Sequence, residues 1–290
     1  MKPPPFTYHD PQTQSEAVAL LGRLENAKLL AGGQSLMAMM NMRYVLPDHL
    51  IDLNKVEGLS GIAAEGDRLR IGAMTRQRDL EFSDTVSRVC PLMAEALLQV
   101  GHRQTRNRGT IGGSLCHLDP SAELPTVAMA MDATVHVAGP NGIRDVAMRD
   151  FPLAYMTPAV EPDEMVTAVT LPLWRGAHGS AFVEFARRHG DFAIASAAVL
   201  LEVDGAGTIR RAALALGGMG EGPARVPDAE AALVGSRGSE AFADAAASAT
   251  KIDAMADVHA SVAYRQHLAG VMARRALEKA LARAAGGENA

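Results

Sequence analysis

Two stretches with paired glycines, Ala31-Gly32-Gly33-Gln34-Ser35 and Thr110-Ile111-Gly112-Gly113-Ser114, lie in otherwise apolar sequence. Each follows a segment typical of a strand or of the approach to one, and each precedes a segment typical of a helix. A helix N-terminus directs backbone N–H groups outwards, so each loop can turn such groups toward an anion. Glycine keeps side chains away from phosphate oxygens and permits positive φ. Two such loops suit a pyrophosphate, although either pair alone is equally consistent with a tight turn.

Length and composition narrow the class of protein. A chain of 290 residues predicts two domains or lobes. Hydrophobic residues make up 48% and charged residues 21%, which is ordinary for a globular protein. The net charge of −5 argues against a nucleic-acid surface, because binding to phosphate backbones relies on clustered lysine and arginine.

Cysteine and histidine usage argues against a metal site in this chain. The only cysteines are Cys90 and Cys116, too few for an iron–sulfur cluster, and no HExxH pattern occurs. The N-terminus lacks the apolar segment of a secretory signal, and no stretch approaches the roughly 20 apolar residues that span a bilayer. We therefore expect a cytoplasmic protein without membrane insertion.

The first half of the chain predicts alternating strands and helices. Residues 13–16 have the spacing of a capping box and begin a helix that reaches residue 24. A short buried strand at 28–30, a methionine-rich helix at 35–41 and a strand at 50–53 form a β-α-β order. Further predicted elements are a hairpin at 61–71, helices at 75–82 (with Thr75 as N-cap), 91–100 and 121–131, a strand at 133–137, and a strand that stops at Pro172.

Residues 174–180 are the best candidate linker, because Gly176, His178 and Gly179 favour irregular backbone. A second domain is expected after it. Its first part predicts three strands across residues 181–216, with a hairpin turn at 204–207. Its second part predicts helices at 228–233, 239–247 and 261–283.

Four motifs that occur in order resemble one family over nearly the whole chain. The sequence is similar to the FAD-binding medium subunit of bacterial molybdenum hydroxylases, of the carbon monoxide dehydrogenase and xanthine dehydrogenase type. The motifs are residues 28–36, residues 71–75, residues 110–114 with Asp119-Pro120, and residues 187–193.

This resemblance implies an α+β fold. A two-lobed, PCMH-type FAD-binding domain is expected at residues 1–175, with sub-lobes of about 1–55 and 56–175. A smaller C-terminal domain is expected at residues 180–285, with a three-stranded antiparallel sheet and a helical bundle.

The resemblance also implies which residues hold FAD. Both glycine loops are expected at the pyrophosphate, the pair Val100 and Gly101 beside the flavin, and Met165 with Val166 on the adenine side. Glu123 stands where many relatives have an aspartate that contacts the ribityl chain. The complete expected set is Lys28, Leu29, Leu30, Ala31, Gly32, Gly33, Gln34, Ser35, Leu36, Val100, Gly101, Thr110, Ile111, Gly112, Gly113, Ser114, Asp119, Glu123, Met165, Val166 and Phe192.

The chain departs from some relatives near the flavin ring. Phe192 stands where they have a tyrosine, and it can stack on a ring without donating a hydrogen bond. A lysine found near this segment in xanthine dehydrogenase relatives is absent from residues 183–186.

Several of these residues also have simpler interpretations. Gln34 and Ser35 can cap the methionine-rich helix, and Asp119-Pro120 can be an ordinary turn. Cys116, beside His117, is better explained as a small core residue than as a ligand. Arg187 and Arg188 can be solvated charges or can brace the domain against other subunits.

By resemblance, the chain is an FAD-carrying subunit that transfers electrons within a molybdenum-containing oxidoreductase. Its expected partners are a large molybdopterin subunit and a small subunit with two [2Fe-2S] clusters, as a dimer of heterotrimers. We assign no catalytic residue and no metal ligand to this chain. The alternatives are a self-contained FAD-dependent oxidoreductase with its own substrate site and a nucleotide-binding scaffold that no longer retains flavin. A Rossmann domain is disfavoured because neither loop fits GxGxxG.

Overall fold

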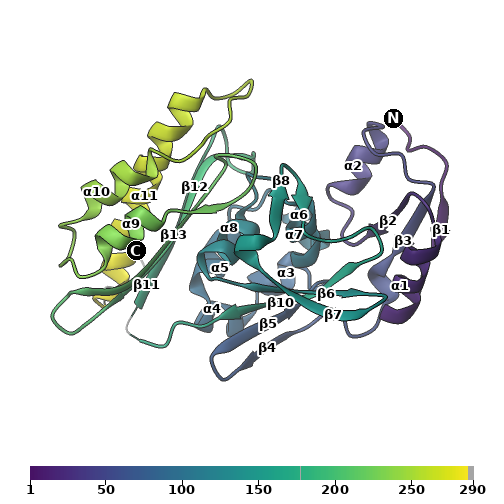
Figure 1. Cartoon of the computed structure of the whole chain (residues 1–290), viewed down its shortest axis with the longest axis horizontal. Helices are drawn as coiled ribbons and strands as arrows, with labels where there is room; N and C mark the ends of the chain where they lie inside the picture. Colours follow the sequence, from purple (N-terminus) through teal and green to yellow (C-terminus); the bar gives the residue numbers. More distant parts are fainter. Residues whose placement is uncertain (177, 287–290) are drawn as a thin grey trace.

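An N-terminal lobe, a central lobe and a C-terminal domain lie in a row along the molecule (Figure 1). The computed structural model describes residues 1–176 and 178–286. The architecture mixes helices and sheets in the two lobes and in the C-terminal domain, so the α+β prediction is confirmed.

The N-terminal lobe is built on a three-stranded parallel sheet of order β1-β3-β2. The predicted capping box is confirmed, since Thr13 and Glu16 each accept a hydrogen bond from the other's backbone N–H. The strand at 28–30 is only half-buried, contrary to prediction, because β2 lies at an edge of this small sheet. The elements are β1 (Thr7–His9), α1 (Gln14–Arg23), β2 (Ala27–Leu30), α2 (Leu36–Asn41), β3 (His49–Asp52) and η1 (Leu53–Lys55).

The central lobe combines a five-stranded antiparallel sheet of order β4-β5-β10-β6-β7 with a group of short helices. Thr75 does not cap the helix that follows it. Its hydroxyl instead contacts the backbone of Gly61, and Arg76 is the N-cap. The elements are β4 (Ile62–Glu65), β5 (Arg68–Gly72), α3 (Gln77–Glu81), α4 (Asp84–Val89), α5 (Pro91–Leu97), α6 (Arg103–Arg108), α7 (Ile111–His117), α8 (Glu123–Ala130), β6 (Thr134–Gly139), β7 (Gly142–Ala147), η2 (Met148–Asp150), β8 (Pro152–Ala154), β9 (Thr157–Pro158) and β10 (Met165–Pro172).

The C-terminal domain has an antiparallel sheet of order β11-β12-β13-β14, covered on one face by helices (Figure 1). Three long strands and the turn at 204–207 were predicted, and the structure adds the short β14. The elements are β11 (His178–Ala186), β12 (Ala193–Val203), β13 (Ile209–Gly217), β14 (Ala224–Arg225), α9 (Pro227–Leu233), α10 (Phe242–Ala249) and α11 (Val262–Ala284).

The predicted linker at 174–180 is too long, because β11 already begins at His178. A Cβ on Gly179 would lie 1.9 Å from the carbonyl oxygen of Ala280, so glycine here lets the strand pack directly on α11. Residue 177 of the predicted linker lies outside the described residues.

The opposite face of this sheet packs on the central lobe. Phe182, Ala198 and Ala215 of the sheet belong to the same buried core as Leu92 of α5 and Val127 of α8. At the edge of this interface, the Glu95 carboxylate accepts hydrogen bonds from the Phe182 N–H at 2.9 Å and from Arg283 at 2.8 and 3.2 Å. The Glu95 carboxylate thereby connects α5 to both β11 and α11.

We expect Glu95→Ala to lower the free energy of unfolding by about 2 kcal/mol, because it removes the acceptor of the Phe182 N–H and the ionic partner of Arg283, which keeps only the Ser180 carbonyl. Denaturant unfolding measures this change. The control is Glu278→Ala, which removes an exposed ion pair with Arg274 and should cost about 0.5 kcal/mol or less. Equal losses in both variants would contradict the role of Glu95 at the interface.

Candidate cofactor site

The first glycine loop leaves the parallel sheet at the carboxyl edge of β2, the edge at which parallel sheets of this kind bind ligands. Gly33 has a φ of +73°, which favours glycine. Within the described part of the chain, the backbone N–H groups of Gly32, Gly33, Gln34 and Ser35 donate to no acceptor. Ser35 occupies the N-cap position of α2, but its hydroxyl makes no capping hydrogen bond with the helix. This loop can therefore offer several donors to an anion.

The second glycine pair is organised differently. It lies inside the first turn of α7 and follows the helix α6, where a strand or the approach to one was expected. Thr110 caps α7 by accepting a hydrogen bond from the Gly113 N–H, and the Gly112 N–H donates to the carbonyl of Ala73. The N–H groups of Ile111 and Ser114 donate to the carbonyls of Thr75 and Thr110. The expected outward row of N–H groups is therefore wrong here, because packing against residues 73–75 and capping use these donors.

The two glycine segments nevertheless meet in space. A Cβ on Gly32 would lie 2.2 Å from the carbonyl oxygen of Arg108, and a Cβ on Gly113 would lie 3.7 Å from the Cβ atom of Ala31. Backbone contact at this distance is open only to glycine. One continuous surface is thus formed by parts of the chain from the N-terminal and central lobes.

Asn54 and Arg76 brace this junction, and sequence reasoning missed both. The Asn54 side chain donates to the Ala31 carbonyl at 3.1 Å, and its backbone N–H donates to Asp52 at 2.9 Å. Arg76 donates to the Arg108 carbonyl at 2.5 Å and also to the Asn54 side chain. A sequence signal for Asn54 was available: Asp52 ends β3, the strand next to β2, and the polar Asn54 follows it in η1.

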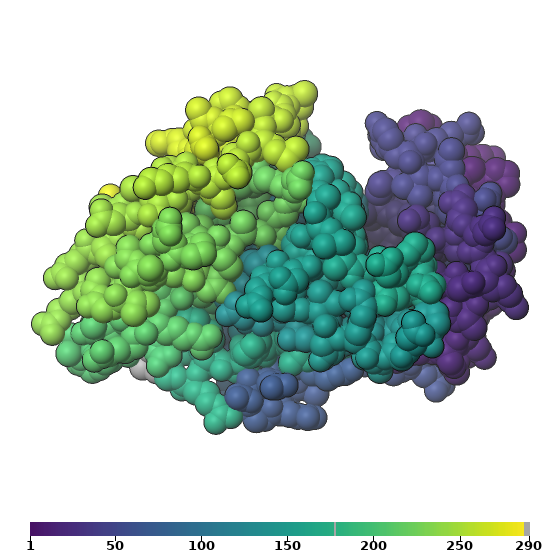
Figure 2. All heavy atoms as spheres, viewed as in Figure 1, coloured from purple at the N-terminus to yellow at the C-terminus, as the bar shows by residue number. Residues whose placement is uncertain are grey.

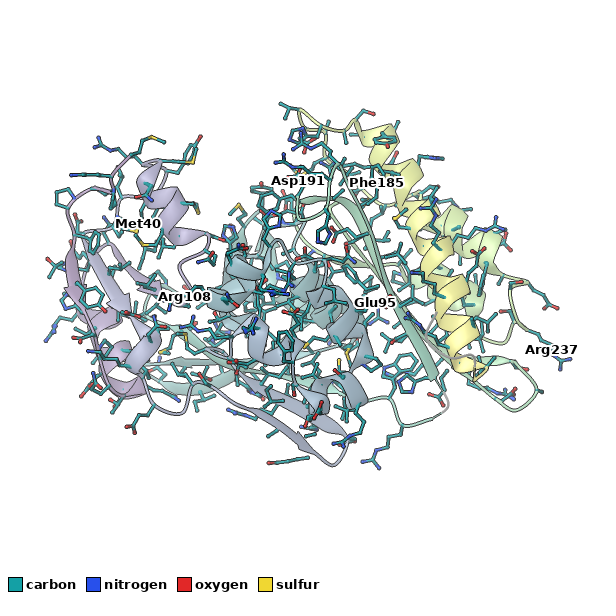
Figure 3. All side chains as sticks on the ribbon, turned by 180° about the vertical axis from the view of Figure 1, so that it is seen from behind. Met40, Glu95, Arg108, Phe185, Asp191 and Arg237 are labelled. Atoms are coloured by element: carbon teal, nitrogen blue, oxygen red, sulfur yellow. The ribbon has the colours of Figure 1, made fainter. Side chains whose placement is uncertain are left out.

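A hollow separates the N-terminal lobe from the rest of the molecule on the side that carries α2. Figure 2 shows it between the purple and blue atoms of this lobe and the teal atoms of the central lobe. Figure 3 shows Met40 on the α2 side of this hollow and Arg108 between the lobes. It shows Asp191 at the end of the C-terminal domain that faces the hollow.

The turn at residues 187–192 packs against the segment at Gly101. Gly190 has a φ of +81°, and a Cβ on it would lie 2.4 Å from the His102 ring. Arg187 donates to the Asp191 carboxylate at 2.8 and 3.1 Å and contacts His259, so it braces the turn from within the domain. The Phe192 side chain is 70% exposed beside this turn. A ring in that position is accessible for stacking on a planar group.

The turn before α8, at residues 119–121, also contacts the strand that follows Phe192. Asp119 accepts a hydrogen bond from the Ser121 N–H at 2.9 Å, as in an ordinary Asx turn. The Ser121 hydroxyl donates to the Ala193 carbonyl at 2.9 Å. The structure therefore brings Gly101, Asp119 and Phe192 to one region, where the central lobe meets the C-terminal domain.

Other expected site residues lie in less accessible places. Met165 and Val166 are core residues of β10, so their side chains are withdrawn from the surface. Val100 is buried, and its carbonyl accepts a hydrogen bond from Arg106 at 2.9 Å. Cys116 is half-buried against the central core, and burial raises the pKa of its thiol to about 12.

The residues around the first glycine loop are more accessible. Lys28 is exposed on β2, whereas Leu29 and Leu30 are half-buried there, as is Leu36 at the start of α2.

Two carboxyl groups, those of the buried Glu123 and the half-buried Glu184, lie where α8 meets the C-terminal sheet. Burial raises the pKa of Glu123 to about 7, and the negative charge of Asp119 acts in the same direction. Burial, with the nearby Glu123 carboxyl, raises the pKa of Glu184 to about 8. Sequence reasoning identified Glu123 but missed Glu184. At neutral pH Glu184 is therefore mostly protonated, whereas Glu123 is near the midpoint of its titration.

Replacing Glu184 should therefore change how stability depends on pH. The folded chain holds this proton more tightly than the unfolded chain, so its stabilisation is complete below the ordinary pKa of 4.5 and is lost as pH rises through about 8. Glu184→Gln mimics the protonated side chain. We expect little change at pH 5 and a stabilisation on the order of 2 kcal/mol at pH 8.5, measured by denaturant unfolding. A stability difference that stays constant with pH would contradict this.

Comparison with known proteins places this geometry in context. A family model described as the FAD binding domain in molybdopterin dehydrogenase matches residues 4–174, and one described as the CO dehydrogenase flavoprotein C-terminal domain matches residues 180–280. The 6-hydroxypseudooxynicotine dehydrogenase complex subunit alpha of Paenarthrobacter nicotinovorans is 39% identical, covering 98% of this chain and 97% of that protein. The carbon monoxide dehydrogenase medium chain of Afipia carboxidovorans is 39% identical, covering 98% and 99%.

A solved structure shows the same fold. It is a carbon monoxide dehydrogenase from Hydrogenophaga pseudoflava that lacks the Mo-pyranopterin moiety of the molybdenum cofactor. One of its chains superposes with a TM-score of 0.95 and is 40% identical, covering 98% of this chain and 99% of that chain.

Proposed function

We propose that this chain transfers electrons between an iron–sulfur partner and an external acceptor. The reason is that it belongs to the family of FAD-binding medium subunits of molybdenum hydroxylases. The observation that carries this proposal is the first glycine loop, where four backbone N–H groups find no acceptor among the described residues. A pyrophosphate oxygen is the acceptor that such a loop suits.

The proposed FAD site extends along the hollow of Figure 2. Residues 28–36 would bind the pyrophosphate through backbone N–H groups and the Ser35 hydroxyl. Residues 110–114 would contribute mainly the Ser114 hydroxyl and a close backbone approach, because their N–H groups have protein acceptors. Val100, Gly101, Asp119, Glu123 and Phe192 would lie at the flavin end, and Met165 and Val166 would contribute backbone groups only.

FAD, when bound, would supply the electron-carrying chemistry. The protein would provide binding, orientation and control of solvent access. The close contact of Gly32 with Arg108 fixes the relative position of the two lobes that would hold the cofactor. The exposed Phe192 offers a surface on the C-terminal domain on which the flavin ring could stack. We assign no proton-transfer residue to the reaction.

The family suggests the partners. We propose a large molybdopterin subunit and a small subunit with two [2Fe-2S] clusters, assembled as a dimer of heterotrimers in the cytoplasm. The described part of the chain contains no helix long and apolar enough to cross a membrane. A self-contained oxidoreductase remains an outcome of the test below.

Gly32→Ala tests the site directly. An alanine Cβ would overlap the Arg108 carbonyl, so the loops must separate, and we expect FAD content to fall at least about tenfold. Absorbance and released nucleotide are measured on the purified chain. Gly22→Ala is the matched control, because a Cβ there meets nothing within 4 Å and FAD content should not change.

The assembled complex then tests the role. With Gly32→Ala, substrate should still reduce the partner's iron–sulfur clusters, while reduction of the external acceptor is lost. If the wild-type chain retains no FAD, either on its own or in the complex with its partners, the proposed function is wrong. If substrate reduces the flavin of the isolated chain, the self-contained oxidoreductase is favoured.

A further inference from the structure

A row of polar residues on the C-terminal sheet faces the central lobe. Glu184 of β11 pairs in register with Ser196 of β12, which pairs with Gly217 of β13. Side chains alternate along a strand, so Glu184 shares a face with Phe182, which packs in the core of the central lobe. Glu184 therefore points away from α11 and toward the lobe that carries the proposed FAD site.

Helix α8 covers this row closely. A Cβ on Gly217 would lie 2.4 Å from the Thr126 hydroxyl and 2.6 Å from the Ser196 hydroxyl. Glu123 is on the same helix and is 9% exposed. The charge of Glu123 raises the pKa of Glu184, so the two carboxyl groups are electrostatic neighbours across the interface between the domains.

Two polar atoms of this row have no partner in the described protein. They are Oε2 of Glu184 and the Ser196 hydroxyl, both buried. Buried polar atoms in folded proteins are normally hydrogen-bonded, so each such exception requires an explanation. A polar group bound in the adjoining site would satisfy them.

No cation is dedicated to this pair among the described residues. Arg106 lowers the pKa of Glu123, but its guanidinium is already held by Glu81 at 2.8 and 3.1 Å and by the Val100 carbonyl. Asp119, before α8, adds a further negative charge.

Three further titratable groups on the surrounding elements have other partners or favour the neutral form. Arg283 of α11 pairs with Glu95 of α5, and Arg225 of β14 pairs with Asp132 and Glu230. Burial lowers the pKa of His117 on α7, which favours its neutral form. Two buried anions without a cation repel strongly, so the pair favours a state that retains a proton.

We propose that Glu184 is a positioning residue for FAD: its carboxyl group at the domain interface disfavours ionisation of Glu123 on α8, so that Glu123 meets the dianionic cofactor as an uncharged hydrogen-bonding group. This inference rests on the proposed FAD site. An ionised Glu123 would repel the negatively charged cofactor, whereas a protonated one donates a hydrogen bond without that repulsion. Above the pH at which the pair ionises, FAD binding must take up a proton from solvent.

The test measures FAD affinity of the full chain, stripped of flavin, by fluorescence quenching between pH 6 and pH 9.5. We expect the wild-type dissociation constant to rise about tenfold over this range, with proton uptake on binding above about pH 8. Calorimetry in two buffers of different ionisation enthalpy measures that uptake. Glu184→Gln should reduce the pH dependence to about twofold. Glu202→Gln, at the far end of the same strand pair, is the control and should behave as wild type.

The outcomes separate the two proposals. A wild-type chain that binds no FAD at any pH contradicts the proposed function itself. FAD binding with the same pH dependence in wild type and Glu184→Gln overturns the role of Glu184 while leaving the FAD site intact. Infrared spectroscopy of the wild-type chain is independent of any variant. A buried protonated-carboxyl band at pH 7 supports the inference, and the absence of such a band overturns it.

Discussion

The contact between Gly32 and the Arg108 carbonyl is the constraint on which the arrangement of this molecule depends. Gly32 follows the parallel sheet of the N-terminal lobe, and Arg108 ends the helix before the second glycine segment of the central lobe. Any side chain at position 32 would force these backbones apart. Because Asn54 and Arg76 bind the same two backbone segments, the contact is held by hydrogen bonds as well as by close packing. The hollow between the lobes therefore has a fixed base.

Local sequence signals predicted the elements whose structure is set by neighbouring residues. The capping box at Thr13, the turn at 204–207 and the long helix after Ser261 all depend on hydrogen bonds within a few residues, and all were confirmed. The family resemblance, carried by motifs spread along the chain, was also confirmed. These features required no knowledge of distant contacts.

The wrong predictions share a different cause, which is tertiary contact. Thr75 looked like a helix cap, but its hydroxyl bonds the distant Gly61. Gly179 looked like part of a linker, but it is a strand residue that makes room for α11. The second glycine pair looked like an anion-binding loop, but Ala73 and Thr75 accept two of its N–H groups. The sequence identified candidate residues, while the direction of their donors was decided by partners far away in the chain.

The same distinction explains the unequal chemistry of the two loops. The first loop lies at the edge of a small sheet, and although Arg108 packs closely on Gly32, the loop's donors find no acceptor among the described residues. The second lies between the central sheet and α8, where unpaired donors would be costly, and its donors are satisfied within the protein. A ligand that spans both would therefore be bound chiefly by hydrogen bonds at one end and by close backbone approach at the other. The C-terminal domain completes this arrangement, because the Glu95–Arg283 pair and the Ser121–Ala193 hydrogen bond hold Phe192 and Glu184 against the central lobe. Positions on that domain can thus influence a cofactor whose principal donors lie in the N-terminal lobe.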